Sequence, residues 1–115
     1  MVLGKNSQSS KPHPRRSVLW RALVKVKKKN FFTPCIVLNI SKEGALIRSI
    51  EHFKIGFVYP IMINAMINQS KHKIYIMAEI CHITLSQRYY RIGISFTKIT
   101  PEDQDILNGF INDTY

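Results

Sequence analysis

Asn39, Ser41 and Gly44 form the most distinctive polar cluster of the chain, in the sextet Asn-Ile-Ser-Lys-Glu-Gly at residues 39–44. An amide and a hydroxyl two positions apart at the end of a strand can both hydrogen bond to a ligand, and a glycine permits close approach or a positive φ. The same spacing also suits a turn in which the side chains bond only to the backbone. The sextet alone therefore leaves a ligand site and a simple turn open.

A second group of residues suited to binding is the set of cations near the N-terminus. Residues 1–30 contain nine Lys or Arg and no acid, whereas beyond residue 30 eight Lys or Arg face seven Asp or Glu. The net charge of +10 is thus concentrated in the N-terminal quarter. Such a segment would attract nucleic acid, a nucleotide or an anionic membrane surface, or would serve only as a solvated tail.

Patterns that would support catalysis or metal binding are missing from the sequence. Glu79 is an isolated acid on an expected strand, and no second carboxylate or Ser/His pairing stands at a readable spacing from it. The four histidines and two cysteines show no metal-ligand spacing. We therefore expect no enzyme, no metal and no cofactor, and we expect Cys35 and Cys81 to be reduced, buried small side chains.

Strands are the elements predicted to position these residues. From Arg21 onward, short runs rich in β-branched and aromatic residues alternate with polar or Gly-containing breaks, which is typical of an all-β barrel or sandwich. Six strands are expected, at residues 22–27, 31–39, 45–49, 57–68, 73–84 and 89–97. Residues 69–72 should form the turn of a long antiparallel hairpin.

The two ends of the chain are predicted to differ from the strand region. Residues 1–14 are polar and contain two prolines, so we expect a flexible basic tail ahead of one domain at residues 15–115. Thr100 and Pro101 can begin a helix over about residues 101–112, whose apolar stripe would dock on the barrel. No run is long enough to span a membrane and no signal peptide is visible, so a cytoplasmic protein is expected.

A basic segment lies before the first expected strand, the sextet lies between the second and third, and the last strand leads into a helix. In this order these features resemble the PilZ domain family, whose members pair an Arg-x-x-x-Arg motif with Asp/Asn-x-Ser-x-x-Gly on a six-stranded barrel. The resemblance covers about residues 11–112 and includes the Gly-Ile-Ser-Phe run at 93–96 that leads into Pro-Glu-Asp at 101–103. It implies an all-β fold, a six-stranded antiparallel barrel with a C-terminal helix. It also implies a receptor for cyclic di-GMP, a bacterial second messenger, that relays its signal to a downstream partner protein.

The second family motif is matched in full and the first only in part. Lys11 to Arg15 has the required spacing with Lys in place of the first Arg, and Arg16 to Arg21 is one residue too long. Measured back from the first expected strand, Arg15 or Arg16 lies nearest the position of the second arginine. The binding residues that the resemblance implies are Lys11, Arg15, Arg16, Arg21, Asn39, Ser41 and Gly44.

Two alternatives stand beside this interpretation. A degenerate PilZ domain would bind no nucleotide and would act as an adaptor, for instance in motility, biofilm regulation or pilus assembly. A small basic β-barrel would bind RNA or single-stranded DNA through exposed aromatic side chains. Apart from Tyr89-Tyr90-Arg91 the aromatic residues fall at core-like positions, Trp20 among them, which disfavours a stacking surface.

Overall fold

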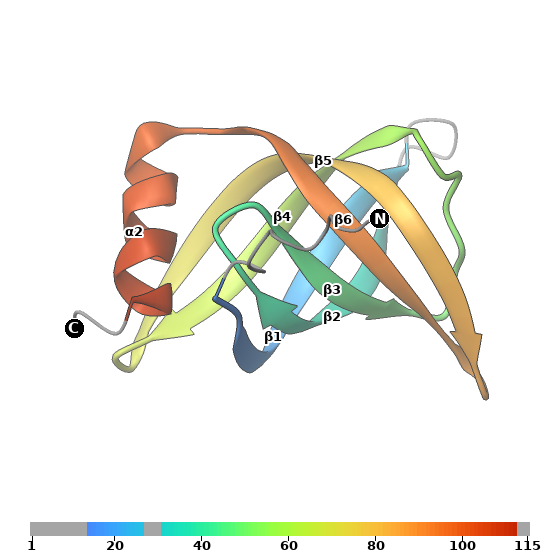
Figure 1. The fold of residues 1–115 in the computed structure, drawn as a ribbon, viewed down its shortest axis with the longest axis horizontal. Coiled ribbons are helices and arrows are strands. Elements are labelled where there is room, and N and C mark those ends of the chain that lie inside the picture. The colour runs from blue at the N-terminus through green and yellow to red at the C-terminus, as the bar shows by residue number, and fades with distance from the viewer. Residues whose placement is uncertain (1–13, 27–30, 113–115) are drawn as a thin grey trace, which may run out of the picture.

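The structure, a computed structural model, describes residues 14–26 and 31–112, which form a closed six-stranded antiparallel barrel followed by a helix (Figure 1). The elements are β1 (Arg16–Val26), β2 (Phe31–Ile40), β3 (Gly44–Ser49), β4 (Val58–Ile67), β5 (Ser70–Ser86), β6 (Tyr89–Ile99) and α2 (Pro101–Ile111). Around the barrel the order is β1-β2-β3-β6-β5-β4, and β1 closes the ring by pairing with both β2 and β4. The predicted fold class is confirmed.

Alternating apolar residues form the barrel core. On β4, Ile61, Ile63, Ala65 and Ile67 are all buried, as their period of two predicts, while the residues between them face outward. Every other strand contributes buried residues in the same way. Burying one such isoleucine stabilises the fold by about 1.5–3 kcal/mol, so the inward rows hold the barrel together.

Helix α2 begins and docks as its sequence predicts. The Thr100 side chain accepts a hydrogen bond from the backbone N–H of Asp103 at 3.2 Å, and Pro101 occupies the first turn. Leu107 and Ile111 are buried against the barrel. The helix ends at Ile111, one residue before the predicted end.

Several strand boundaries differ from the prediction. β1 begins at Arg16 rather than at residue 22, because exposed Ser17, Leu19 and Arg21 alternate with inward residues across a bulge in the β1–β2 ladder. The predicted turn at residues 69–72 is wrong, since the strands β4 and β5 meet at a two-residue turn, Asn68-Gln69, with φ angles of 51° and 65°. β5 also continues to Ser86, through the predicted connection.

The two cysteines have different environments. Cys35 is 3% exposed, as predicted, and its burial raises the pKa of the thiol from 9.0 to about 11, against the opposing effect of a hydrogen bond with Ser49. The prediction that Cys81 is buried is wrong. A register shift between Ile80 and His82 interrupts the alternation of β5 and turns the Cys81 side chain outward.

The predicted placement of the aromatic residues is only partly correct. Trp20 lies in the core at 5% exposure, but Phe32, Phe57 and Tyr75 are 51%, 55% and 61% exposed. Phe32 and Tyr75 occupy outward positions of β2 and β5. Because these strands carry apolar residues on both faces, the alternation of their sequence does not show which face is buried. The barrel therefore has apolar residues on its outer wall as well as in its core.

Candidate functional site

Ser41 closes the turn between β2 and β3. Its hydroxyl donates to the carbonyl of Gly44 at 3.2 Å and accepts from the N–H groups of Glu43 and Gly44 at 3.4 and 3.2 Å. The Ser41 backbone N–H donates to the same carbonyl at 2.9 Å. Because the side chain is only 3% exposed and all its bonds stay within the turn, Ser41 shapes the loop that the sextet forms.

Gly44 permits a close approach between β3 and β6. A Cβ at this position would lie 2.2 Å from the carbonyl oxygen of Ile94, a separation that no side chain tolerates. The turn is tied to the same strand by the N–H of Phe96, which donates to the Glu43 carbonyl at 2.8 Å. Of the two roles predicted for this glycine, the close approach is therefore the one that the fold requires.

Arg15 and Asn39 meet at the start of β1. The Nη1 group of Arg15 donates to the Oδ1 atom of Asn39 at 3.0 Å, because the pairing of Ser17 with Asn39 brings the beginning of β1 beside the end of β2. Arg15 is exposed, and within residues 14–26 and 31–112 no carboxylate pairs with it. The fold thus brings one arginine of the first motif onto the asparagine of the second, with guanidinium N–H groups left for an anion.

Arg16 is held by the C-terminal helix instead. Its Nη1 group donates to the carbonyl of Phe110 at 2.6 Å, and its guanidinium lies 4.1 Å from the centre of the Phe110 ring. The same ring contacts Trp20, with 4.9 Å between the ring centroids. The apolar stripe of the helix predicted docking on the barrel, but nothing in the sequence indicated that Phe110 would receive this arginine.

Two candidate cations remain. Lys11 falls outside the described residues. Arg21 pairs in register with Ile36 and Asn64, four positions beyond Ser17 along β1, which corresponds to about 13 Å of strand. The structure therefore brings Arg15 to the sextet, ties Arg16 to α2 nearby, and leaves Arg21 farther along the outer wall.

A polar hollow of about 540 Å³ adjoins the turn, bounded by Lys42, Glu43, Ser95 and Gln104 among others. The amide of Gln104 donates to the Lys42 carbonyl at 3.4 Å and so links the helix to the turn. Among the described residues no three His, Cys, Asp or Glu side chains gather as metal ligands would. The arrangement provides guanidinium and amide groups, which can bind an anionic ligand, beside a hydrogen-bonded turn.

The sequence matches the PilZ domain over residues 12–113, nearly the whole chain. This chain belongs to the PilZ domain family. The match agrees with the geometry, since the motif residues Asn39, Ser41 and Gly44 gather around the turn at one end of the barrel. No curated protein matches this PilZ domain in sequence. No helix of the described part is both long and apolar enough to cross a membrane.

Solved PilZ structures share the fold. The Bacillus subtilis inhibitor of motility MotI/DgrA is similar to this chain with a TM-score of 0.80 and 14% identity, over 92% of this chain and 51% of the other. The PilZ domain of Escherichia coli YcgR, solved with cyclic di-GMP, gives a TM-score of 0.70 at 14% identity over 91% of both chains. The K. pneumonia MrkH complex with cyclic di-GMP gives 0.65 at 13% identity, over 92% and 52%. This PilZ domain spans about half the length of the MotI chain and of a second, longer YcgR chain.

Proposed function

We propose that this PilZ domain is a receptor for cyclic di-GMP, and that the ligand binds where Arg15 meets Asn39 beside the turn of Ser41 and Gly44. The observation that carries the proposal is the 3.0 Å hydrogen bond between Arg15 and Asn39, which joins residues of the two separate motifs at one place. The YcgR and MrkH structures hold cyclic di-GMP on the same fold, which supports the choice of ligand.

The chemistry of the residues suits this ligand. Cyclic di-GMP has two phosphates and two guanines, so a guanidinium group can bind phosphate oxygens, form bidentate bonds to guanine O6 and N7, or stack on a purine. Arg15 has donors left for any of these, whereas the Arg16 guanidinium would have to leave Phe110 or bind from that position. Lys11 could contribute only as a point charge, so its contribution should be smaller.

The proposal extends to the output of the receptor. A bound nucleotide would hold the basic tail at residues 1–14, which includes Lys11, against the barrel. The altered surface would then be recognised by a downstream partner protein, in motility or biofilm regulation. As the receptor of an intracellular messenger, the protein would act in the cytoplasm and would catalyse no reaction.

Isothermal titration with cyclic di-GMP tests the proposal, with GTP as the control ligand. Arg15→Ala should weaken binding roughly 5- to 150-fold, which corresponds to the loss of about 1–3 kcal/mol from one good bidentate contact. Arg21→Ala is the matched control, since that arginine lies farther along β1 and should leave the affinity nearly unchanged. Lys11→Ala should have an effect between the two.

Three results would contradict the receptor or its site. If Arg15→Ala binds as the unaltered protein does while Arg21→Ala loses the ligand, the site lies farther along β1 than we propose. If the unaltered protein binds no cyclic di-GMP, the adaptor alternative replaces the receptor. If a short oligonucleotide binds more tightly than cyclic di-GMP near physiological salt, the nucleic-acid alternative replaces it.

A further inference from the structure

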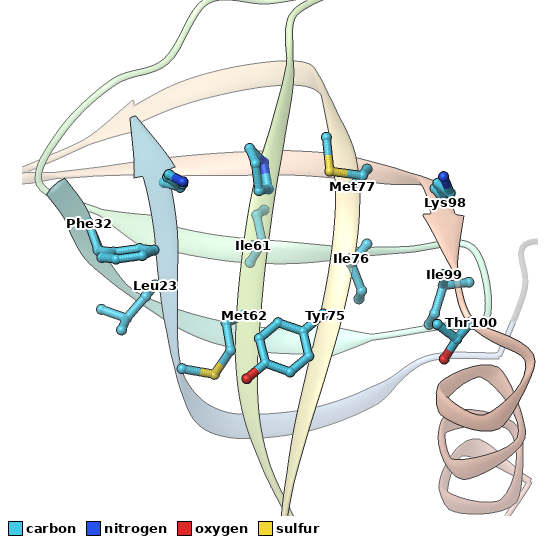
Figure 2. A pocket seen from close by; sticks show the side chains of 12 residues that line it. Leu23, Phe32, Ile61, Met62, Tyr75, Ile76, Met77, Lys98, Ile99 and Thr100 are labelled. Atoms are coloured by element: carbon cyan, nitrogen blue, oxygen red, sulfur yellow. The ribbon is translucent and has the colours of Figure 1, made fainter. Parts of the chain in front are cut away.

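An apolar row crosses four strands on the outer wall of the barrel, away from the core and from the turn at Ser41. Register pairs connect Tyr75 to Met62, Met62 to Leu23, and Leu23 to Pro34, from β5 through β4 and β1 to β2. Figure 2 shows Leu23, Met62 and Tyr75 beside one another on neighbouring strands. Tyr75 is 61% exposed, so this row faces solvent.

The apolar row borders a groove of about 420 Å³. Exposed Phe32 lies at one side of this groove, and Ile99, just before α2, lies at the other (Figure 2). Apolar side chains exposed next to one another around a groove can mark a site where another molecule docks.

Cations flank the apolar row on both sides. On one side, two residues along β5, β4, β1 and β2 from the apolar row, a row of register pairs runs through Lys73, Asn64, Arg21 and Ile36 and continues to Arg48 on β3. On the other side, Lys25 pairs with Phe32 and Lys98 pairs with Met77, and both lysines line the groove. We call these three rows together the striped face.

Acidic side chains are missing from the striped face. No Asp or Glu belongs to the three rows as the strand registers define them. The acid nearest to the apolar row is Asp103 of α2, whose carboxylate accepts the backbone N–H of Tyr75 at 3.3 Å. On the basic side, Arg48 pairs in register with Arg91, and its guanidinium lies 4.8 Å from the centre of the Tyr89 ring, so two like charges face each other on neighbouring strands.

We infer that the striped face is the docking site for an amphipathic helix of a partner protein, with an apolar stripe flanked on both sides by Asp or Glu. Neighbouring strands lie about 4.8 Å apart, so the four-strand row is about 14 Å long, the length of nine or ten helical residues. The flanking cations lie about 6.7 Å to either side, within the width of a helix. An acidic helix would match both the shape and the charge.

Charge and side-chain type disfavour the other occupants. A second copy of this chain would bring a net charge of +10 against a basic face. Single-stranded nucleic acid stacks its bases on aromatic rings, but the centre of the apolar row is aliphatic, formed by Leu23 and Met62. Tyrosine, methionine and arginine are the residue types that protein interfaces favour.

A designed helical peptide of about 14 residues, with Leu and Met in one stripe and Glu along both edges, serves as the probe. Fluorescence anisotropy should show it binding the full chain, and a version with Gln in place of every Glu should bind at least about tenfold more weakly. Lys25→Glu and Lys73→Glu, on opposite sides of the row, should each weaken the acidic peptide about fivefold or more. Tyr75→Ala should do the same.

Lys42→Glu is the matched control, because it makes the same charge change outside the striped face and should alter peptide affinity less than about twofold. Thermal unfolding of every variant checks that the barrel is intact. Binding of cyclic di-GMP should be unchanged in Lys25→Glu and Lys73→Glu, so failure of the nucleotide proposal and failure of this one are distinguishable.

Several outcomes would overturn the inference. One is the absence of peptide binding at about 1 mM, or equal binding of the Glu and Gln peptides. Another is an equal loss of affinity in Lys42→Glu and Lys25→Glu, which would mean that net charge alone attracts the peptide. A third is binding of a 12-nucleotide oligo(dT) that is tighter than binding of the peptide and is abolished by Lys25→Glu and Lys73→Glu. A fourth is sedimentation of the full chain as a dimer that Tyr75→Ala dissociates.

Discussion

Ser41 and Asn39 differ in how much of their hydrogen-bonding capacity the fold already uses. The Ser41 hydroxyl makes three contacts within its own turn, while the Asn39 amide accepts one hydrogen bond, from Arg15. Asn39 therefore has an NH₂ group to offer a ligand, and Ser41 contributes mainly by holding the loop in shape. A Ser41→Ala variant would accordingly affect binding through the turn, and a loss of affinity in it would not by itself identify a ligand contact.

The motif residues could be predicted from sequence because their types and spacing are local. Asn39, Ser41 and Gly44 lie within six residues, and the close approach at Gly44 was one of two expected reasons for the glycine. The interaction between Arg16 and Phe110 joins residues 94 positions apart, and no spacing rule connects them. Long-range contacts of this kind depend on where the helix docks.

The two thiols should react differently in the folded protein. Cys81 is exposed and should be alkylated by iodoacetamide, whereas Cys35 is buried with its pKa raised to about 11 and should react only on unfolding. Mass spectrometry should find one modified cysteine in the native protein and two in denaturant. Modification of both thiols in the native state would contradict the burial of Cys35.

The same pKa shift predicts a loss of stability at high pH. Below the ordinary value of 9.0 the Cys35 thiol is protonated in both states, so its contribution to the free energy of unfolding is constant. As pH rises from 9.0 toward about 11, the unfolded chain loses the proton first, which destabilises the fold by about 2–3 kcal/mol in total. Urea unfolding should show a shallower decline in Cys35→Ala, and identical slopes would contradict the shift.

Alternating buried residues show which segments form strands, but the residues at which a strand begins and ends depend on its pairing with the neighbouring strands. β4 could be predicted closely because Ile61 to Ile67 alternate without interruption. The start of β1 could not, because a bulge between Ser17 and Trp20 interrupts its alternation and leaves the apolar Leu19 on the outward face. The exposure of Cys81 depends on another bulge, and a bulge reverses the face of every residue beyond it without changing composition.

The turn between β4 and β5 contains a residue type that its backbone angles do not favour. Asn68 and Gln69 both have positive φ, at 51° and 65°, a combination that favours Asn-Gly over Asn-Gln. Gln69→Gly should therefore raise the free energy of unfolding by about 0.5–1 kcal/mol, since glycine adopts this conformation without steric cost. Urea denaturation measures the change.

Gln69→Ala is the control for that variant, because alanine removes the side chain but keeps the Cβ that positive φ disfavours. It should leave the unfolding midpoint unchanged or slightly lower. A gain in Gln69→Ala as large as in Gln69→Gly would mean that the side chain, and not the backbone angle, limits the stability of the turn.

For the whole molecule, the sequence predicted the number of strands and the C-terminal helix. It could not predict the striped face, because the face collects residues from all six strands, which are neighbours only once the ring is closed. Phe32 and Tyr75 looked like core residues for the same reason, since their direction depends on the register of the strands.

Salt dependence should distinguish a specific nucleotide site from general attraction by the net charge of +10. Cyclic di-GMP carries two phosphates, so the slope of log affinity against log salt concentration should be no steeper than about −2. An oligonucleotide bound by many cations should give a steeper slope, about −0.7 per phosphate contacted. Titrations at several salt concentrations measure both slopes, and equal steep slopes would indicate that both ligands bind as simple polyanions.

The contact of Arg16 with Phe110 brings the first strand and the last helix of the domain to one place. The polypeptide therefore enters and leaves this barrel side by side, although 94 positions separate the two residues. A short linker could connect these two points while a new opening is made in an exposed loop, so the fold is a good candidate for circular permutation. By the same geometry the barrel could be inserted into a surface loop of a host protein with little disturbance to the host.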